Sequence, residues 1–228
     1  MSTTSSAPRR FPTKALFLTF EGPDGSGKST QARILAERLR QESYAVLETA
    51  EPGGTPIGQQ IRRILLDSAN QELRPTAELL LMFAARAQNV EQWILPALED
   101  GKIVVCDRFT DSSVAYQGAG RGLGREVVLE LDRIACRGLV PDLTLCIDID
   151  SESGLARARS RNREAVERET RLEEQALEFH QRVRAAYHQI AQNEPKRFRL
   201  LDGRGTREEI AVKVWTEVAA HLTAVRSA

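Results

Sequence analysis

The chain has 228 residues, of which 32 are basic and 32 acidic, so its formal net charge is +0. This balance argues against a protein whose main partner is nucleic acid or an anionic membrane, because both are bound through an excess of basic residues. No apolar run approaches the roughly 20 residues that span a bilayer, and the length suits one domain of ordinary size.

The first residues, MSTTSSAPRRFPTK, contain arginine but no apolar segment after it, so they lack the pattern of a secretory signal. We expect a disordered tail over residues 1–14 and a single domain over residues 15–228. Cys106, Cys136 and Cys146 show no metal-type pair spacing. This cysteine usage favours a reduced, cytoplasmic setting.

Short apolar runs typical of buried strands recur along the chain. We expect strands at residues 15–20, 45–49, 102–106, 143–149 and 197–201. Most of these runs are continuously apolar rather than alternating, as strands covered on both faces are. The segments between them carry apolar residues at helical spacing, for example Ala32, Leu35, Ala36 and Leu39. Alternating strands and helices predict an α/β fold with a parallel sheet.

The first of these strands leads into the sequence GPDGSGKS at residues 22–29, which satisfies G-x-x-x-x-G-K-[ST] in full. Glycines let backbone N–H groups turn inward and hold an anion at a helix N-terminus. Lys28 adds a charge for the β- and γ-phosphates, and the Ser29 hydroxyl can ligate Mg²⁺. Because a strand precedes the loop and a helix follows it, we set aside a chance glycine loop. The expected ATP-binding residues are Gly22, Pro23, Asp24, Gly25, Ser26, Gly27, Lys28, Ser29 and Thr30.

A phosphate loop alone does not separate kinases from switches and motors. The sequence has no N-K-x-D motif of the kind that reads guanine in regulatory GTPases, and the chain is small for a mechanical ATPase. A compact kinase that phosphorylates a small acceptor remains.

Four further segments supply candidates for the acceptor site. They are EPGGTPIGQQIRRILLD at 51–67, ELLLMFAARAQ at 78–88, CDRFTDSSVAYQGAGRGLG at 106–124 and GLARARSR at 154–161. Together with the phosphate loop, and in this order, they closely resemble bacterial thymidylate kinases of the subtype with a basic lid. The resemblance implies the P-loop nucleoside-monophosphate kinase fold, with a five-stranded parallel sheet flanked by helices and a helical lid. It also implies Mg²⁺-dependent transfer of phosphate from ATP to dTMP by a homodimer.

The same resemblance assigns roles to individual residues. Arg108 matches the arginine that holds the acceptor phosphate, and a planar guanidinium suits that task. Asp24 faces the acceptor sugar and phosphate, while Asp107 and Glu51 hold Mg²⁺ through water. The residues expected around dTMP are Asp24, Glu51, Pro52, Arg62, Met82, Phe83, Arg86, Arg108, Ser113, Tyr116 and Gln117. Ordinary structural alternatives stay open, such as an Asp107–Arg108 pair, a solvated Glu51 or an ion-paired helix arginine at Arg86.

Within this set, Ser113 and Gln117 match positions that hydrogen-bond the thymine edge, and Arg86 matches the arginine that reads the base. Tyr116 matches a ring packed near the 2′ carbon of the deoxyribose, where a ribose hydroxyl would clash.

Two positions depart from the family pattern. Ala50 stands where many relatives carry arginine. Relatives also place a stacking phenylalanine four residues before the arginine at Arg86, and here that position is Met82. Helical geometry favours Met82 as the residue that covers the base, because it shares a face with Arg86. Ring chemistry favours the adjacent Phe83, and we predict Phe83 as the stacking residue with Met82 beside it.

The arginine-rich segment at 151–171 is the expected lid. Some thymidylate kinases carry an arginine in the phosphate loop at the position of Gly25, so another cation must serve the transferring phosphoryl group here. Arg157 and Arg161 are the candidates, and with Lys28, Asp24 and Arg108 they form the expected catalytic set. If the segment is helical, Arg157, Arg161, Arg168 and Arg171 fall near one face. The alternative is a solvated helix face, since exposed ion pairs contribute little.

These observations predict an ATP-dependent dTMP kinase. Two alternatives remain: a kinase for another pyrimidine monophosphate, and a catalytically idle nucleotide-binding module.

Overall fold

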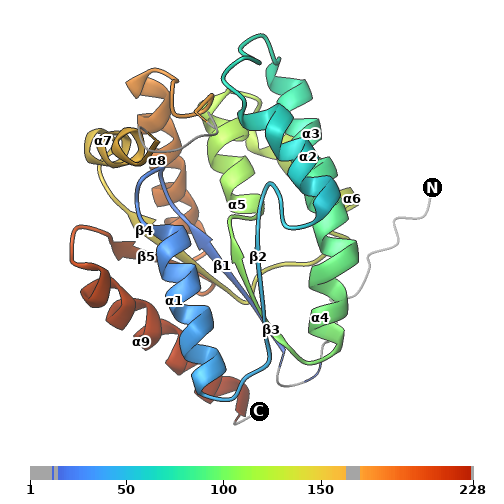
Figure 1. Cartoon of the computed structure of the whole chain (residues 1–228), viewed down its shortest axis with the longest axis vertical. Coiled ribbons are helices and arrows are strands. Elements are labelled where there is room, and N and C mark those ends of the chain that lie inside the picture. Colours follow the sequence, from blue (N-terminus) through green and yellow to red (C-terminus); the bar gives the residue numbers. More distant parts are fainter. Residues whose placement is uncertain (1–11, 13–14, 163–169, 227–228) are drawn as a thin grey trace.

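The computed structural model describes residue 12, residues 15–162 and residues 170–226 (Figure 1). The predicted tail at residues 1–14 lies outside the described residues apart from Pro12. Among the described residues, no helix combines the length and apolar character needed to cross a bilayer.

The fold is built on a five-stranded parallel sheet in the order β2-β3-β1-β4-β5. The strands are β1 (Leu16–Glu21), β2 (Val46–Ala50), β3 (Ile103–Asp107), β4 (Leu143–Asp148) and β5 (Phe198–Asp202). Each lies within about one residue of its expected start. The continuous apolar runs of β1, β3 and β4 are buried on both faces, whereas the edge strands β2 and β5 are partly exposed. The prediction of a five-stranded parallel sheet flanked by helices is confirmed.

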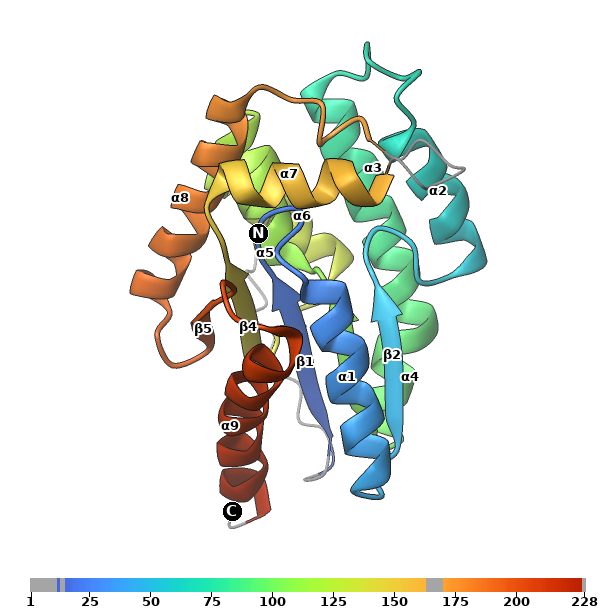
Figure 2. The same cartoon turned by 60° about the vertical axis from the view of Figure 1, so that its left-hand side comes forward.

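Helices cover both faces of this sheet (Figures 1 and 2). The helical elements are α1 (Lys28–Gln41), α2 (Pro56–Leu66), α3 (Pro75–Asn89), α4 (Leu95–Glu99), α5 (Thr110–Ser113), α6 (Arg125–Ala135), α7 (Ser151–Asn162), α8 (Leu177–Asn193) and α9 (Arg207–Arg226). Two π-helical segments, Val90–Ile94 and Val114–Gly120, continue α3 and α5.

Two apolar clusters form the core. One packs α1 and α9 against one face of the sheet, with Leu35 and Val218 buried beside Leu18. The other packs α3, α4, α6 and α8 against the opposite face, around Phe17 and Phe198. The predicted helical stripe on α1 therefore faces the sheet, as its spacing indicated.

The carboxyl ends of the strands meet at one edge. In the strand register, Asp107 of β3 pairs with Phe20 of β1 and with Ala50 of β2, so the loops that follow β1, β2 and β3 begin at the same level. Helix α7 crosses above this edge, over the start of α1 (Figure 2). Open α/β sheets bind ligands at this edge, near the point where the strand order changes direction.

Candidate active site

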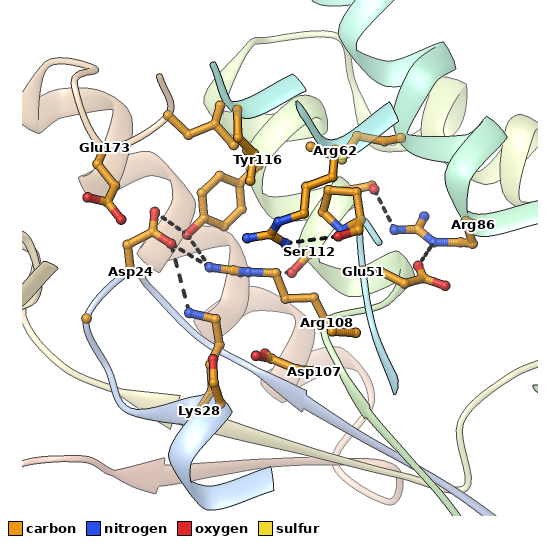
Figure 3. A pocket seen from close by; sticks show the side chains of 18 of the residues that line it. Asp24, Lys28, Glu51, Arg62, Arg86, Asp107, Arg108, Ser112, Tyr116 and Glu173 are labelled. Atoms are coloured by element: carbon orange, nitrogen blue, oxygen red, sulfur yellow. Dashed lines mark hydrogen bonds and ion pairs between the residues drawn. The ribbon is translucent and has the colours of Figure 1, made fainter. Parts of the chain in front are cut away.

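A cavity of about 550 Å³ opens at the carboxyl edge of the sheet. It receives side chains from the loop after β1, the loop after β2, α2, α3, the end of β3 and the π-helical segment Val114–Gly120 (Figure 3). The predicted residues on its wall are Asp24, Gly25, Gly27, Lys28, Ser29, Thr30, Glu51, Pro52, Arg62, Met82, Arg86, Asp107, Arg108, Ser113, Tyr116 and Gln117. These residues come from elements far apart in the sequence. Their motifs identified them, whereas their spacing along the chain gives no sign that they meet in one cavity.

The loop at residues 22–29 wraps tightly at one end of the cavity. Gly25 and Gly27 have φ angles of 74° and 94°, in the left-handed region that glycine adopts at no steric cost. Gly27 directly precedes α1, so the N–H groups of the first helical turn face this loop. Gly22, Pro23 and Ser26 belong to the same loop but are not on the cavity wall.

Lys28 is buried at the base of this loop. Its ammonium donates to the Pro23 carbonyl oxygen at 3.2 Å and lies 3.9 Å from the Asp24 carboxylate. Burial and the nearby Arg108 lower the pKa of Lys28 to about 8, although Asp24 acts in the opposite direction. Burial disfavours the charged form of Lys28, and a phosphate bound beside it would stabilise that charge.

Arg108 crosses the middle of the cavity. Its Nη2 donates to Asp24 Oδ1 at 2.6 Å and to the Tyr116 hydroxyl at 3.1 Å, and that hydroxyl donates to Asp24 Oδ2 at 2.9 Å. Burial alone would raise the pKa of Asp24, but Arg108 and Lys28 outweigh it and lower that pKa. Arg108, Asp24 and Tyr116, all expected around dTMP, therefore form one connected set (Figure 3).

A buried carboxylate behind Arg108 holds this set in place, and sequence reasoning missed it. Glu21 accepts from the Phe109 N–H at 2.8 Å, from the Ser112 hydroxyl at 2.5 Å and from the Tyr187 hydroxyl at 2.9 Å. The Ser112 hydroxyl in turn accepts from Arg108 Nη1 at 3.0 Å. Nothing in the neighbouring sequence indicates this role for Glu21. The residue ends an apolar strand, and its hydrogen-bond partners lie 88 to 166 residues later in the chain.

Arg62 reaches the same space from α2. Its Nη1 donates to the Pro52 carbonyl oxygen at 2.9 Å, so the loop after β2 and the helix that follows it are tied together at the cavity wall (Figure 3). Thr55 caps α2 through its side-chain oxygen, which accepts from the Gly58 N–H at 3.0 Å.

Arg86 lies at the far end of the cavity and is buried. Its Nε donates to Glu51 at 2.5 Å, and its Nη2 donates to Ser113 Oγ and to the Phe109 carbonyl oxygen, both at 3.0 Å. Its remaining terminal nitrogen, Nη1, is buried and has no hydrogen-bond partner among the described residues. Such a donor is costly to leave unpaired, so it is suited to an acceptor on a bound molecule.

The environment of Glu51 alters its expected role. Its two carboxylate oxygens accept from Arg86 Nε and from Asn89 Nδ2, the latter at 3.1 Å. Only 3% of the residue is exposed, so a solvated loop carboxylate is excluded. Because both oxygens already accept from α3, these contacts favour a role for Glu51 in orienting Arg86 over a role in holding a metal-bound water.

Met82 and Phe83 point in different directions from α3. Met82 lines the cavity, whereas Phe83 is absent from its wall and packs in the core cluster, its ring 4.6 Å from the Arg86 guanidinium carbon. The prediction of Phe83 as the residue that covers the base is corrected by this placement. The helix is regular here, so residues four apart share a face and a residue one position later turns away by about 100°.

The predicted lid is helical only in part. Helix α7 runs over Ser151–Asn162, where Arg157 is exposed and its Nη1 lies 3.5 Å from the Gly203 carbonyl oxygen. The side chain of Arg161 and the whole of Arg168 lie outside the described part of the chain. Arg171 does not share a helical face with Arg157: it lies in a turn beyond α7, buried, with Nη1 2.8 Å from Glu78. The expectation of one arginine face reaching Arg171 is wrong, since the helix ends before it.

The segment after this turn contributes one further side chain that sequence reasoning did not single out. Glu173 is buried and lines the cavity, where Figure 3 shows its carboxylate on the side of Asp24. It closes the sequence TRLE at residues 170–173.

A divalent cation fits the phosphate end of the cavity. Asp107 Oδ1 is buried there without a hydrogen-bond partner among the described residues, and Ser29 contributes an exposed hydroxyl on the same wall. Oxygen ligands of this kind suit Mg²⁺. No cluster of three or more His, Cys, Asp or Glu side chains suited to a metal occurs among the described residues, so a bound cation would share its ligands with nucleotide phosphates.

Comparison with known proteins agrees with this geometry. The family model for thymidylate kinase matches residues 20–214. A thymidylate kinase of Pelobacter propionicus is 52% identical over 203 residues, covering 89% of this chain and 93% of its own. That of Thermomicrobium roseum is 52% identical over 202 residues, again covering 89% of this chain and 93% of its own.

A solved structure is also similar. The crystal structure of thymidylate kinase from Ehrlichia chaffeensis superposes with a TM-score of 0.73 at 33% identity, covering 90% of this chain and 98% of that chain. With a family model spanning most of the sequence and relatives near half identity over nearly the whole length, the chain belongs to the thymidylate kinase family.

Proposed function

We propose that this chain transfers the γ-phosphoryl group of ATP to the 5′-phosphate of dTMP, giving ADP and dTDP. The observation that carries the proposal is the continuity of the cavity, which runs from Lys28 and Ser29 at the phosphate loop to Arg86, Ser113 and Gln117 at its far end. A kinase needs its two nucleotides in one enclosed space with their phosphates facing each other.

The transfer itself requires positioning and positive charge more than covalent chemistry. An oxygen of the dTMP phosphate attacks the γ-phosphorus, the bond from that phosphorus to the bridging oxygen breaks, and ADP leaves. Lys28 and the N–H groups of the phosphate loop hold the ATP phosphates. Arg108 holds the acceptor phosphate after exchanging part of its contact with Asp24, and Tyr116 and Asp24 position the sugar.

The base end of the cavity supplies recognition of thymine. Met82 covers the base, and Arg86 offers the unpaired Nη1 donor to a carbonyl oxygen of the ring. Glu51 acts through Arg86 by fixing its orientation. Arg62 and Pro52 close the side of the acceptor site.

Mg²⁺ is the cation we propose for the phosphate end, with Ser29 and Asp107 as the residues that hold it, Asp107 through water. When bound, it neutralises charge on the β- and γ-phosphates. Arg157 and Arg161 are the proposed lid cations, which add positive charge to the transferring group.

A homodimer is proposed for the assembly, and the cytoplasm for the location. Exposed apolar side chains lie on α2, α3 and α6: Ile57, Ile64, Leu80, Val127 and Ile134. Helix α3 packs against both α2 and α6, so these side chains lie on neighbouring helices, as a contact surface between subunits requires. Light scattering during size-exclusion chromatography tests the dimer, and a monomer at micromolar concentration would contradict it.

The activity is tested by a coupled ADP-release assay over dTMP, dUMP, UMP, dCMP, CMP, AMP and GMP. We expect the highest kcat/KM for dTMP. A stronger response to another pyrimidine monophosphate would favour that kinase instead, and ATP binding without turnover on any acceptor would favour an idle nucleotide-binding module.

A further inference from the structure

A fully buried carboxylate lies directly behind the base end of the cavity. Glu78 of α3 is 0% exposed, and all its partners come from other elements. Its Oε1 accepts from Gln117 Nε2 at 2.8 Å, and its Oε2 lies 3.0 Å from Arg121 Nη2 and 2.8 Å from Arg171 Nη1. Neither the reaction nor the phosphate contacts described above use this residue.

The Glu78 carboxylate fixes the orientation of the Gln117 side-chain amide. A carboxylate flanked by two guanidinium groups is ionised and only accepts hydrogen bonds. Burial would raise the pKa of Glu78, but hydrogen bonds from Arg121 and Gln117 with the charges of both arginines lower it, so the ionised form persists at neutral pH. The end of the amide that faces Glu78 must therefore be the NH₂ group.

The other end of that amide faces the cavity. Gln117 is 1% exposed, lines the cavity, and has no hydrogen bond to its Oε1 among the described residues. It therefore presents an acceptor to the cavity, not a donor. Arg86 also lines this cavity, and its buried Nη1 is a donor without a hydrogen-bond partner among the described residues.

This pair of groups fits one kind of pyrimidine edge. Uracil and thymine present an N–H at position 3 beside a carbonyl oxygen at position 4, which match an acceptor and a donor. Cytosine presents a bare nitrogen at position 3 beside an NH₂ group, so both contacts would be mismatched. A base whose polar groups meet the wrong partners binds much more weakly, because its hydrogen bonds to water are lost and no new ones replace them.

We propose that Glu78 is a positioning residue for base selection, which holds the Gln117 amide so that the acceptor pocket prefers a base with an N–H at position 3 over cytosine. Arg121 and Arg171 keep Glu78 in place: Arg121 Nη1 donates to Gln175 Oε1 at 2.7 Å, and Arg171 Nε donates to the Leu65 carbonyl oxygen at 2.5 Å. The inference rests on the proposed function, because it assumes that the acceptor is a pyrimidine monophosphate.

The test compares dUMP with dCMP, which differ only at positions 3 and 4 of the ring. In Glu78→Gln, the new amide can donate an N–H to Gln117 Oε1 and so turn the Gln117 NH₂ group toward the cavity. The ratio of kcat/KM for dUMP over dCMP should then fall by roughly tenfold to a hundredfold. The ratio for dTMP over dUMP, which reports on the methyl group, should stay near the wild-type value.

Two further variants separate positioning from general destabilisation. Asp111→Asn also weakens a buried pair with arginine, Arg197 at 2.7 Å, but its side chain is not on the wall of this cavity, so the dUMP:dCMP ratio should not change. Gln117→Met removes the amide and leaves the Glu78 ion pairs intact. It should lower the ratio by itself, and adding Glu78→Gln to it should have no further effect on that ratio.

A folded Glu78→Gln protein with the wild-type dUMP:dCMP ratio would overturn the proposal. If that variant is too unstable to purify, an unchanged ratio in Gln117→Met would overturn it as well. Failure of the proposed function is recognised separately, since the wild-type chain would then phosphorylate neither dTMP nor dUMP.

Discussion

Helix α7 rests on the phosphate loop through two glycines, and the contact can be tested with one methyl group. A Cβ atom on Gly154 would lie 2.6 Å from the Asp24 carbonyl oxygen, and one on Gly25 would lie 2.0 Å from the Gly154 carbonyl oxygen. Both separations are shorter than real Cβ contacts, and both neighbours are backbone atoms that cannot rotate away. In Gly154→Ala, the first turn of α7 must therefore move off the loop.

Two effects of opposite sign follow from Gly154→Ala. Alanine stabilises a helix interior by about 1 kcal/mol relative to glycine. Overpacking against the loop costs about 1–3 kcal/mol, but only while α7 is seated on the loop. The substitution therefore favours an unseated helix without weakening the rest of the fold. A shift of this size lowers the equilibrium constant for seating roughly 5-fold to 150-fold, and the seated population falls by up to that factor.

We expect kcat of Gly154→Ala to fall by up to that factor, with little change in the dTMP KM and an unchanged or slightly higher Tm. Coupled ADP release and thermal denaturation measure the two quantities. The matched control is Ser160→Ala, on an exposed position of the same helix, which raises helix propensity without a clash. A wild-type kcat in Gly154→Ala would refute the reasoning, because it would show that transfer does not need α7 seated on the loop.

Other predictions follow from the same geometry. Lys28→Ala should lower kcat roughly 100-fold or more, about 3 kcal/mol of barrier, with little change in Tm; near-normal turnover in the ADP-release assay would contradict its role. Burial and the nearby Asp111 raise the pKa of Glu21 from 4.5 to about 7, so the folded state keeps a proton that the unfolded state loses. Stability should therefore fall as pH rises from about 4.5 to about 7, by at most about 3 kcal/mol, and this dependence should flatten in Glu21→Gln. Urea titrations across that range test it, and equal slopes in both proteins would count against it. Met82→Ala should raise the dTMP KM, whereas Phe83→Ala should lower stability by about 3–5 kcal/mol; the reverse pattern would restore Phe83 as the stacking residue. Tyr116→Ala should narrow the kcat/KM preference for dTMP over its ribonucleotide counterpart, and an unchanged ratio would mean that the ring does not face the 2′ carbon.

The sequence was most informative where a local pattern has a single physical meaning. The buried strands and the glycines of the phosphate loop were predicted from their own residues, because continuous apolar runs and left-handed turns are local requirements. Arg108, Tyr116 and Arg86 were found at the cavity because complete motifs, rather than single residues, marked them.

Long-range pairing accounts for what was missed. The charge of Arg171 was visible, but its partner Glu78 lies 93 positions earlier in the chain, and no spacing rule links them. Glu51 looked like a solvated or metal-facing carboxylate until Arg86 and Asn89 were seen to take both of its oxygens. A buried charge is defined by the groups that compensate it, and these are set by the fold rather than by the neighbouring sequence.

The contact between Gly25 and Gly154 also explains why the phosphate loop carries no arginine at residue 25. Any side chain at residue 25 would need a backbone φ of 74° and would place its Cβ 2.0 Å from the Gly154 carbonyl oxygen. An arginine there and α7 seated on the loop are therefore incompatible. With glycine at this position, α7 packs on the loop, and its Arg157, one turn after Gly154, has Nη1 3.5 Å from the Gly203 carbonyl oxygen. Arg157 and Arg161 on this helix are the cations that we propose in place of an arginine at residue 25.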